Sequence, residues 1–158
     1  MNVRDVMDSN PSTVGPDATV ADVGRLMLEE NLDGVPVVAT SGQLLGMVTR
    51  TDLVAKHARV HFPLYFAILG TVMPIERRHS DEDMRRTLAV TARDLMEEDV
   101  PVISPDATVD DAATLLIEHH VNALPVMEND RLVGMIDQAD IIRLLLIEEG
   151  DADQPPSP

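Results

Sequence analysis

The sequence predicts an α/β (α+β) fold made of two β-α-β-β-α repeats that pack as a pseudo-twofold pair, with a helical insert between them. The chain repeats itself in three places. RDVM at 4–7 recurs as RDLM at 93–96, PDATVAD at 16–22 as PDATVDD at 105–111, and LLGMVTRTDL at 44–53 as LVGMIDQADI at 132–141. One unit of roughly 55 residues buries too little surface to be stable alone, so we expect the copies to share a core.

These matches divide the chain into four parts. We expect the first repeat at 1–57, a helical insert or linker at 58–90, the second repeat at 91–149 and an acidic, proline-rich tail at 150–158. The tail has no apolar periodicity and is expected to be disordered.

A helix is predicted after the Pro-Asp-Ala turn of each copy. Thr19 and Thr108 are placed to cap these helices, with Asp22 and Asp111 three residues on at the capping-box position. Apolar residues then recur at helical spacing and give each helix one buried face: Val20, Val23, Leu26 and Met27 in the first copy, and Val109, Ala112, Leu115 and Leu116 in the second.

Two short β-rich runs and a second helix complete each copy. The strands are predicted at 35–39 and 44–49, around a turn with Gly42, and at 124–127 and 132–136, around the turn at 128–130. The second helices are predicted from Arg50 and from Gln138 through Leu146, and short extended segments near Val14 and Ile103 supply the first strand of each copy.

Charge and composition exclude several classes of protein. The net charge of -16 repels phosphate backbones, so nucleic acid is not an expected partner. The chain has no cysteine, which leaves the redox compartment open. Its first ten residues lack the apolar core of a secretory signal, so a cytoplasmic location is the default expectation. The apolar run at 62–73 is short of the roughly 20 residues that span a bilayer, so no membrane contact is expected.

The paired pattern PDATVxD, then VPVV or LPVM, then GMVTRTD or GMIDQAD, resembles a tandem CBS-domain pair, also called a Bateman module. The resemblance covers nearly the whole chain and departs from the family in the long spacer between the repeats. It implies a regulatory module, and not an enzyme, that binds AMP, ADP, ATP, S-adenosylmethionine, NAD or a similar adenosine-containing ligand in a cleft between repeats. The common catalytic glycine, serine and histidine motifs are absent, and no cofactor is expected beyond such an effector.

Thr49 and Asp52 are the candidate ligand-binding pair of the first copy, and in the resembling family this pattern holds nucleotides. A helix N-terminus offers unpaired N–H groups to a phosphate, with the Thr49 hydroxyl as an added donor, and the Asp52 carboxylate suits the two adjacent hydroxyls of a ribose. The same Thr-x-x-Asp spacing is also a plain helix cap that requires no ligand.

In the second copy Asp137 replaces the threonine while Asp140 is kept, and the added negative charge would repel a phosphate. This cleft is therefore expected to be empty or to take an uncharged moiety. Apolar residues near the two motifs are candidates to sandwich an adenine, or equally to be core: Val14, Val35, Pro36, Met47 and Val48 in the first copy, and Ile103, Leu124, Pro125, Met135 and Ile136 in the second.

The spacer holds all three aromatic residues of the chain, Phe62, Tyr65 and Phe66. A short apolar segment in an acidic protein has to be buried, so we expect a homodimer with Tyr65 and Phe66 near its interface. His57 and His61 are four residues apart on a predicted helix, but two ligands do not make a metal site.

The alternative to ligand sensing is a structural or protein-interaction module with vestigial ligand clefts.

Overall fold

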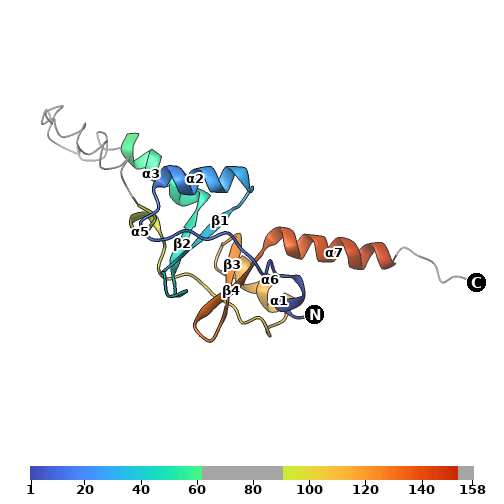
Figure 1. Ribbon diagram of the computed structural model, residues 1–158. Helices are drawn as coiled ribbons and strands as arrows, with labels where there is room; N and C mark the ends of the chain where they lie inside the picture. The colour runs from blue at the N-terminus through green and yellow to red at the C-terminus, as the bar shows by residue number, and fades with distance from the viewer. Residues whose placement is uncertain (62–90, 153–158) are drawn as a thin grey trace, which may run out of the picture. The chain divides into compact units, whose positions relative to one another are not determined.

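The computed structural model describes residues 1–61 and 91–152. Its helices and strands, labelled in Figure 1, are α1 (Val3–Val6), α2 (Val20–Glu29), β1 (Gly34–Val38), β2 (Leu44–Thr49), α3 (Arg50–His61), α5 (Ala92–Leu95), α6 (Val109–Glu118), β3 (Ala123–Glu128), β4 (Arg131–Asp137) and α7 (Gln138–Ala152). They form two compact units. One contains residues 1–12, 41–44 and 99–152, and the other contains 13–40, 45–61 and 91–98. The predicted α/β (α+β) class is confirmed.

Both predicted capping boxes are present. The Thr19 hydroxyl accepts the Asp22 N–H at 3.1 Å, and the Thr108 hydroxyl accepts the Asp111 N–H at 3.1 Å. Each aspartate in turn accepts the backbone N–H of its threonine, so the start of α2 and of α6 is fixed by a reciprocal pair. Hydrogen bonds from these threonines hold the pKa of the Asp22 and Asp111 carboxyls below the usual value.

Helices α2 and α6 also end in the same way, with a left-handed residue after the last turn. Asn31 and His120 follow α2 and α6 in the left-handed conformation, with φ of 53° and 54°. Beyond them, the Leu32 N–H donates to the Met27 carbonyl at 2.9 Å and the Val121 N–H to the Leu116 carbonyl at 3.0 Å. This pattern satisfies the last carbonyls of a helix and turns the chain toward the next strand.

The sheets follow the predicted hairpins. β3 and β4 pair antiparallel through a two-residue turn at Asn129 and Asp130, both with positive φ, as a type I′ turn requires. β1 and β2 form the other two-stranded sheet, and Gly42 in its turn has φ of 87°. The predicted extended segments pair in parallel with these sheets, Val14 with β1 and Ile103 with β3.

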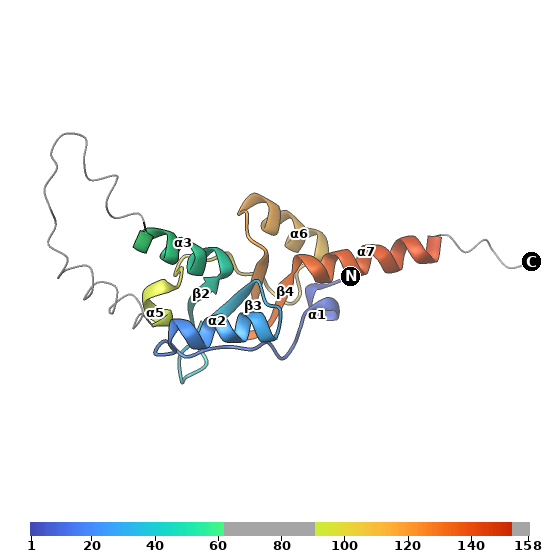
Figure 2. The ribbon, with the colours of Figure 1, turned by 90° about the horizontal axis from the view of Figure 1, so that it is seen from above.

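The first twelve residues of the chain lie in the unit that holds the second repeat. The Val3 N–H donates to the Ala107 carbonyl and the Arg4 N–H to the Pro105 carbonyl, both at 2.9 Å. Asp8 and Met135 exchange two backbone hydrogen bonds, also at 2.9 Å. Figure 2 shows the result, in which α1 lies beside α7 although they come from opposite ends of the chain.

The other unit is completed in the same way by residues 91–98. The Ala92 N–H donates to the Ala18 carbonyl at 2.8 Å, and Met47 and Glu97 exchange hydrogen bonds at 3.0 and 2.8 Å. Each RDxM segment therefore packs on the other copy of the repeat, not on the copy that it precedes in sequence. The sequence pattern does not predict this exchange, because α1 and α5 have four residues each and carry no periodic signal.

One glycine of each copy, Gly46 in LGM and Gly134 in VGM, makes room for the exchanged segment. A Cβ at Gly134 would lie 2.8 Å from the Asp8 carbonyl oxygen and 2.6 Å from the Met7 sulfur, and a Cβ at Gly46 would lie 2.5 Å from the Glu97 carbonyl oxygen. Only a residue without a side chain permits such a close approach of two backbones.

Each unit buries its own apolar core, and the exchanged segment supplies part of it. Val3 and Ala92 are completely buried in the two cores. In the unit with α1 and α7 the core comprises Val3, Ile103, Ala112, Leu116, Leu124, Val126 and Ile136. In the unit with α2 and α3 it comprises Val23, Met27, Val35, Val37, Val48 and Ala92. Burial of these side chains stabilises the units by roughly 25 cal/mol per Å² of apolar surface.

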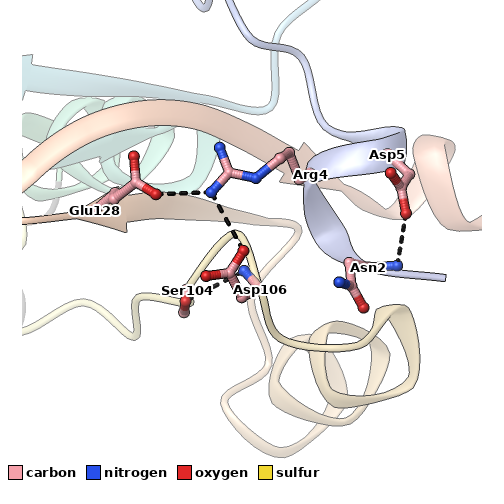
Figure 3. Close-up of polar contacts among 6 residues, drawn as sticks. All are labelled: Asn2, Arg4, Asp5, Ser104, Asp106 and Glu128. Atoms are coloured by element: carbon pink, nitrogen blue, oxygen red, sulfur yellow. Dashed lines mark hydrogen bonds and ion pairs between the residues drawn. The ribbon is translucent and has the colours of Figure 1, made fainter.

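Arg4 adds a polar anchor to α1. Its Nη2 atom lies 2.7 Å from Glu128 Oε1 and 3.3 Å from Asp106 Oδ1, as Figure 3 shows. The equivalent residue of the other exchanged segment is Arg93, but Ala39 stands where Glu128 stands. The anchor therefore belongs to one unit only.

Helix α7 is longer than predicted. It continues past Leu146 to Ala152, so three residues of the tail expected to be disordered, 150–152, are helical. The leucine and isoleucine residues before Glu148 are compatible with a continuous helix, and the helix does not end at Gly150. The remainder of the tail and the insert from 62 to 90, with its aromatic residues, lie outside the described residues.

Candidate functional site

The first motif sits where β2 passes directly into α3. Thr49 is the last residue of the strand and Arg50 the first of the helix. Val48 is completely buried in the core while Thr49 and Asp52 are only partly buried. Burial of Val48 therefore fixes the end of β2 in the core, while the polar side chains of the motif stay accessible to solvent.

Thr49 and Asp52 contact each other as a capping box. The Asp52 Oδ2 atom accepts the Thr49 N–H at 2.8 Å and the Thr49 hydroxyl at 2.9 Å, and the Asp52 N–H donates to the Thr49 hydroxyl oxygen at 3.2 Å. The hydroxyl proton is thus already engaged, and not directed outward to a phosphate. Among the side chains that the structure describes, those of residues 1–55 and 91–150, none donates to the second carboxylate oxygen, Oδ1.

Arg50 adds a positive charge that the sequence analysis overlooked. Its Nε lies 2.7 Å from the Leu32 carbonyl oxygen and 3.6 Å from Asp33 Oδ1, and its Nη2 donates to Asn31 Oδ1 at 3.1 Å. The guanidinium therefore ties the loop before β1 to the start of α3. Gln138 is the equivalent residue of the second copy, which has no positive charge at this position.

The second motif has the same backbone arrangement with different charges. The Asp140 Oδ2 atom accepts the Asp137 N–H at 3.0 Å, and Asp137 Oδ1 accepts the Asp140 N–H at 2.9 Å. Arg143 then donates to the remaining Asp140 oxygen, Oδ1, at 2.6 Å. Burial raises the pKa of the Asp140 carboxyl, and the neighbouring Asp137 carboxylate raises it further.

Most of the apolar residues predicted near the motifs are core. Val35 and Val48 belong to the core of one unit, and Ile103, Leu124 and Ile136 to that of the other. Pro36, Met47, Pro125 and Met135 are buried as well. Val14 alone among these candidates is partly exposed. Adenine packing by these residues stays a prediction.

Other features give no competing site. Among the described residues, no three histidine, aspartate or glutamate side chains are grouped to hold a metal ion. The side chains of His57 and His61 lie outside the description. None of the described helices is long and apolar enough to cross a membrane. An open hollow of about 470 Å³ is lined by Ser41, Gln43, Leu44, Met127, Asn129, Asp130 and Arg131, at or next to the strand turns.

Comparison with known proteins accounts for this arrangement. The family model described as CBS domain matches the chain twice, at residues 3–58 and 92–147. An uncharacterized protein of Methanocaldococcus jannaschii, MJ1426, is 29% identical over 157 residues, which is 92% of each chain.

Two solved structures with the same fold contain adenosyl ligands. CBSX2 in complex with AMP matches with a TM-score of 0.72 and 24% identity, over 94% of this chain and 98% of that one. The CBS domain pair of MJ0100, in complex with 5′-methylthioadenosine and S-adenosyl-L-methionine, matches with a TM-score of 0.72 and 19% identity over the same shares. With two matches of the family model that together cover most of its length, the chain belongs to the CBS-domain family as a tandem pair.

Proposed function

We propose that this chain is a non-catalytic regulatory module that binds an adenosine-containing ligand at Thr49 and Asp52. The observation that carries the proposal is the Asp52 carboxylate. One oxygen is held by Thr49 while the other has no donor among the described residues, at a partly exposed position beside a helix N-terminus. A fixed carboxylate with one open oxygen suits a pair of ribose hydroxyls.

The ligand class follows from the chemistry of the motif. A ribose explains the open carboxylate. Arg50, at the start of the same helix and 3.6 Å from Asp33, adds a positive charge that favours an anionic group on the ligand. The structures of CBSX2 with AMP and of the MJ0100 pair with adenosyl ligands support an adenosine derivative over another ribose compound. The second motif carries Asp137 and no counterpart of Arg50, so a phosphorylated ligand is expected at one motif per chain.

A thermal-shift screen tests the ligand class. AMP, ADP, ATP, NAD, S-adenosylmethionine and cyclic dinucleotides are compared with guanosine monophosphate and inorganic phosphate as controls. A ligand at 100 times its Kd stabilises the native state by about 2.7 kcal/mol, which corresponds to a rise in Tm of about 5 to 10 °C for a chain of this size. No rise with any adenosyl compound would favour the alternative, an interaction module with vestigial clefts.

We also propose that the chain forms a homodimer. Helix α7 exposes Ile142, Leu145, Leu146 and Ile147, each at least half exposed, which is more apolar surface than a helix of a monomer usually leaves in water. These residues join Tyr65 and Phe66 of the insert as candidates for the interface. Closed twofold association is the commonest way to cover such surface.

Light scattering is expected to give twice the chain mass of 17.3 kDa. Leu145→Asp with Leu146→Asp should shift the protein toward monomer if α7 forms the interface, and Tyr65→Asp with Phe66→Asp should do so if the insert forms it. Leu28→Asp, at an exposed position of α2, controls for the added charge. A wild type that is strictly monomeric at micromolar concentration contradicts the dimer.

A further inference from the structure

The carboxylate of the second motif has no open oxygen. Asp140 Oδ2 accepts the Asp137 N–H at 3.0 Å, and Oδ1 accepts Arg143 Nη1 at 2.6 Å, the shortest of the ion pairs among the described residues. The Asp140 side chain is 15% exposed whereas that of Arg143 is 69% exposed. Arg143 therefore occupies this oxygen with a guanidinium that itself lies mostly in solvent.

The first motif differs at this position. Ala55 occupies the place on α3 that Arg143 occupies on α7, three residues after the aspartate in both helices. The rest of the arrangement matches: each aspartate accepts the N–H of its capping residue, at 2.8 Å in the first motif and 3.0 Å in the second. A methyl group in place of a guanidinium leaves Asp52 Oδ1 open to a donor from outside the protein.

A difference in local charge explains why only one motif carries the arginine. Asp137 and Asp140 place two carboxylates within one helical turn, and burial of Asp140 adds to the cost of ionising both. The Arg143 charge offsets that cost. Thr49 is neutral, so Asp52 requires no such partner.

We propose that Arg143 is a specificity-determining residue that closes the second motif to ribose and so confines adenosine recognition to the first. The proposal rests on the proposed function at Asp52. A ribose hydroxyl at Asp140 has to displace a guanidinium that already donates a charge-assisted hydrogen bond, and a neutral hydroxyl is the weaker donor. At Asp52 the same hydroxyl displaces only water.

Calorimetry with adenosine tests the proposal, because the uncharged nucleoside removes the repulsion between Asp137 and a phosphate. Wild type is expected to bind one adenosine per chain. Arg143→Ala is expected to bind a second, with an affinity at that motif raised roughly fivefold, the upper range for an exposed ion pair. The reverse exchange, Ala55→Arg, should weaken the first site by a similar factor.

Two variants separate charge from size. Ala55→Met adds a side chain of comparable length without a donor and should leave the affinity of the first site within about twofold of wild type. Arg143→Lys keeps a cation beside Asp140 and should keep the second motif closed. Because Arg143 is mostly exposed, its replacement should not unfold the protein, and a thermal melt of each variant checks this.

The outcomes distinguish the two proposals. One adenosine per chain in wild type and in Arg143→Ala, with Ala55→Arg unchanged, overturns the role of Arg143 and leaves the function at Asp52 standing. Two equivalent adenosines in wild type also overturn it. If wild type binds neither adenosine nor any adenosyl ligand of the thermal-shift screen, the proposed function fails, and the selective role of Arg143 fails with it.

Discussion

Replacing Gly134 by alanine is expected to destabilise the protein by about 1 to 3 kcal/mol, the usual cost of forcing extra atoms into a packed site. The new Cβ would lie 2.8 Å from the Asp8 carbonyl oxygen and 2.6 Å from the Met7 sulfur. Asp8 is held by two backbone hydrogen bonds to Met135, so the N-terminal segment has to move away from β4 and weaken both. Gly46→Ala should act in the same way on Glu97, whose carbonyl oxygen is 2.5 Å from the new Cβ.

Urea denaturation measures this effect, and the chain supplies its own controls. At Gly15 a Cβ meets nothing within 4 Å, so Gly15→Ala should be neutral or slightly stabilising through the unfolded state. At Gly34 the near contact is only the terminal methyl of Met47, which can rotate away, so an intermediate effect is expected. If Gly134→Ala proves as stable as Gly15→Ala, the N-terminal segment does not pack against β4 as described.

Replacing Asp52 by alanine is expected to weaken binding of an adenosine-containing ligand by about 1 to 3 kcal/mol, which raises Kd by roughly 5- to 150-fold. The substitution removes both carboxylate oxygens, the one held by Thr49 and the open one that we assign to the ribose. Isothermal titration with the best ligand of the thermal-shift screen measures the change.

The matched control is Asp140→Ala. It removes the equivalent carboxylate from α7, with the loss of the same backbone hydrogen bond, but at a motif that Arg143 covers. Both variants should therefore lose some helix stability while only Asp52→Ala loses affinity. Equal affinity of wild type and Asp52→Ala would show that the pair at 49 and 52 is a helix cap and nothing more.

Local signals in the sequence predicted the elements well. The boxes at Thr19 and Thr108 mark the starts of α2 and α6 because a helix start is determined by the hydrogen bonds of a few adjacent residues. The hairpin turns are equally local. The partner of each RDxM segment was not predictable in this way, since a repeat shows which segments are equivalent and not which copy they pack against. The glycines before Met47 and Met135 were the available signal, because they mark a close backbone approach.

At the site, the sequence pattern located Thr49, Asp52, Asp137 and Asp140 but not the side chains around them. Arg143 lies one helical turn beyond the motif, at a position where the sequence pattern alone predicts an ordinary exposed helix residue. The apolar candidates were left open between core and ligand contact, and the structure places most of them in the core. Hydrophobicity alone does not separate these two roles, because a buried valine and an adenine-contacting valine have the same sequence pattern.

The exchange of the RDxM segments has a consequence for how the protein is made on the ribosome. The unit that contains α2 and α3 has all of its residues once synthesis passes Glu98. Met1–Ser12, although synthesised before that unit, have to wait until β4 is synthesised, because Asp8 pairs with Met135. Contacts between residues so far apart in sequence form slowly. We therefore expect the unit with β1 and β2 to fold during translation and the N-terminal segment to dock near its end.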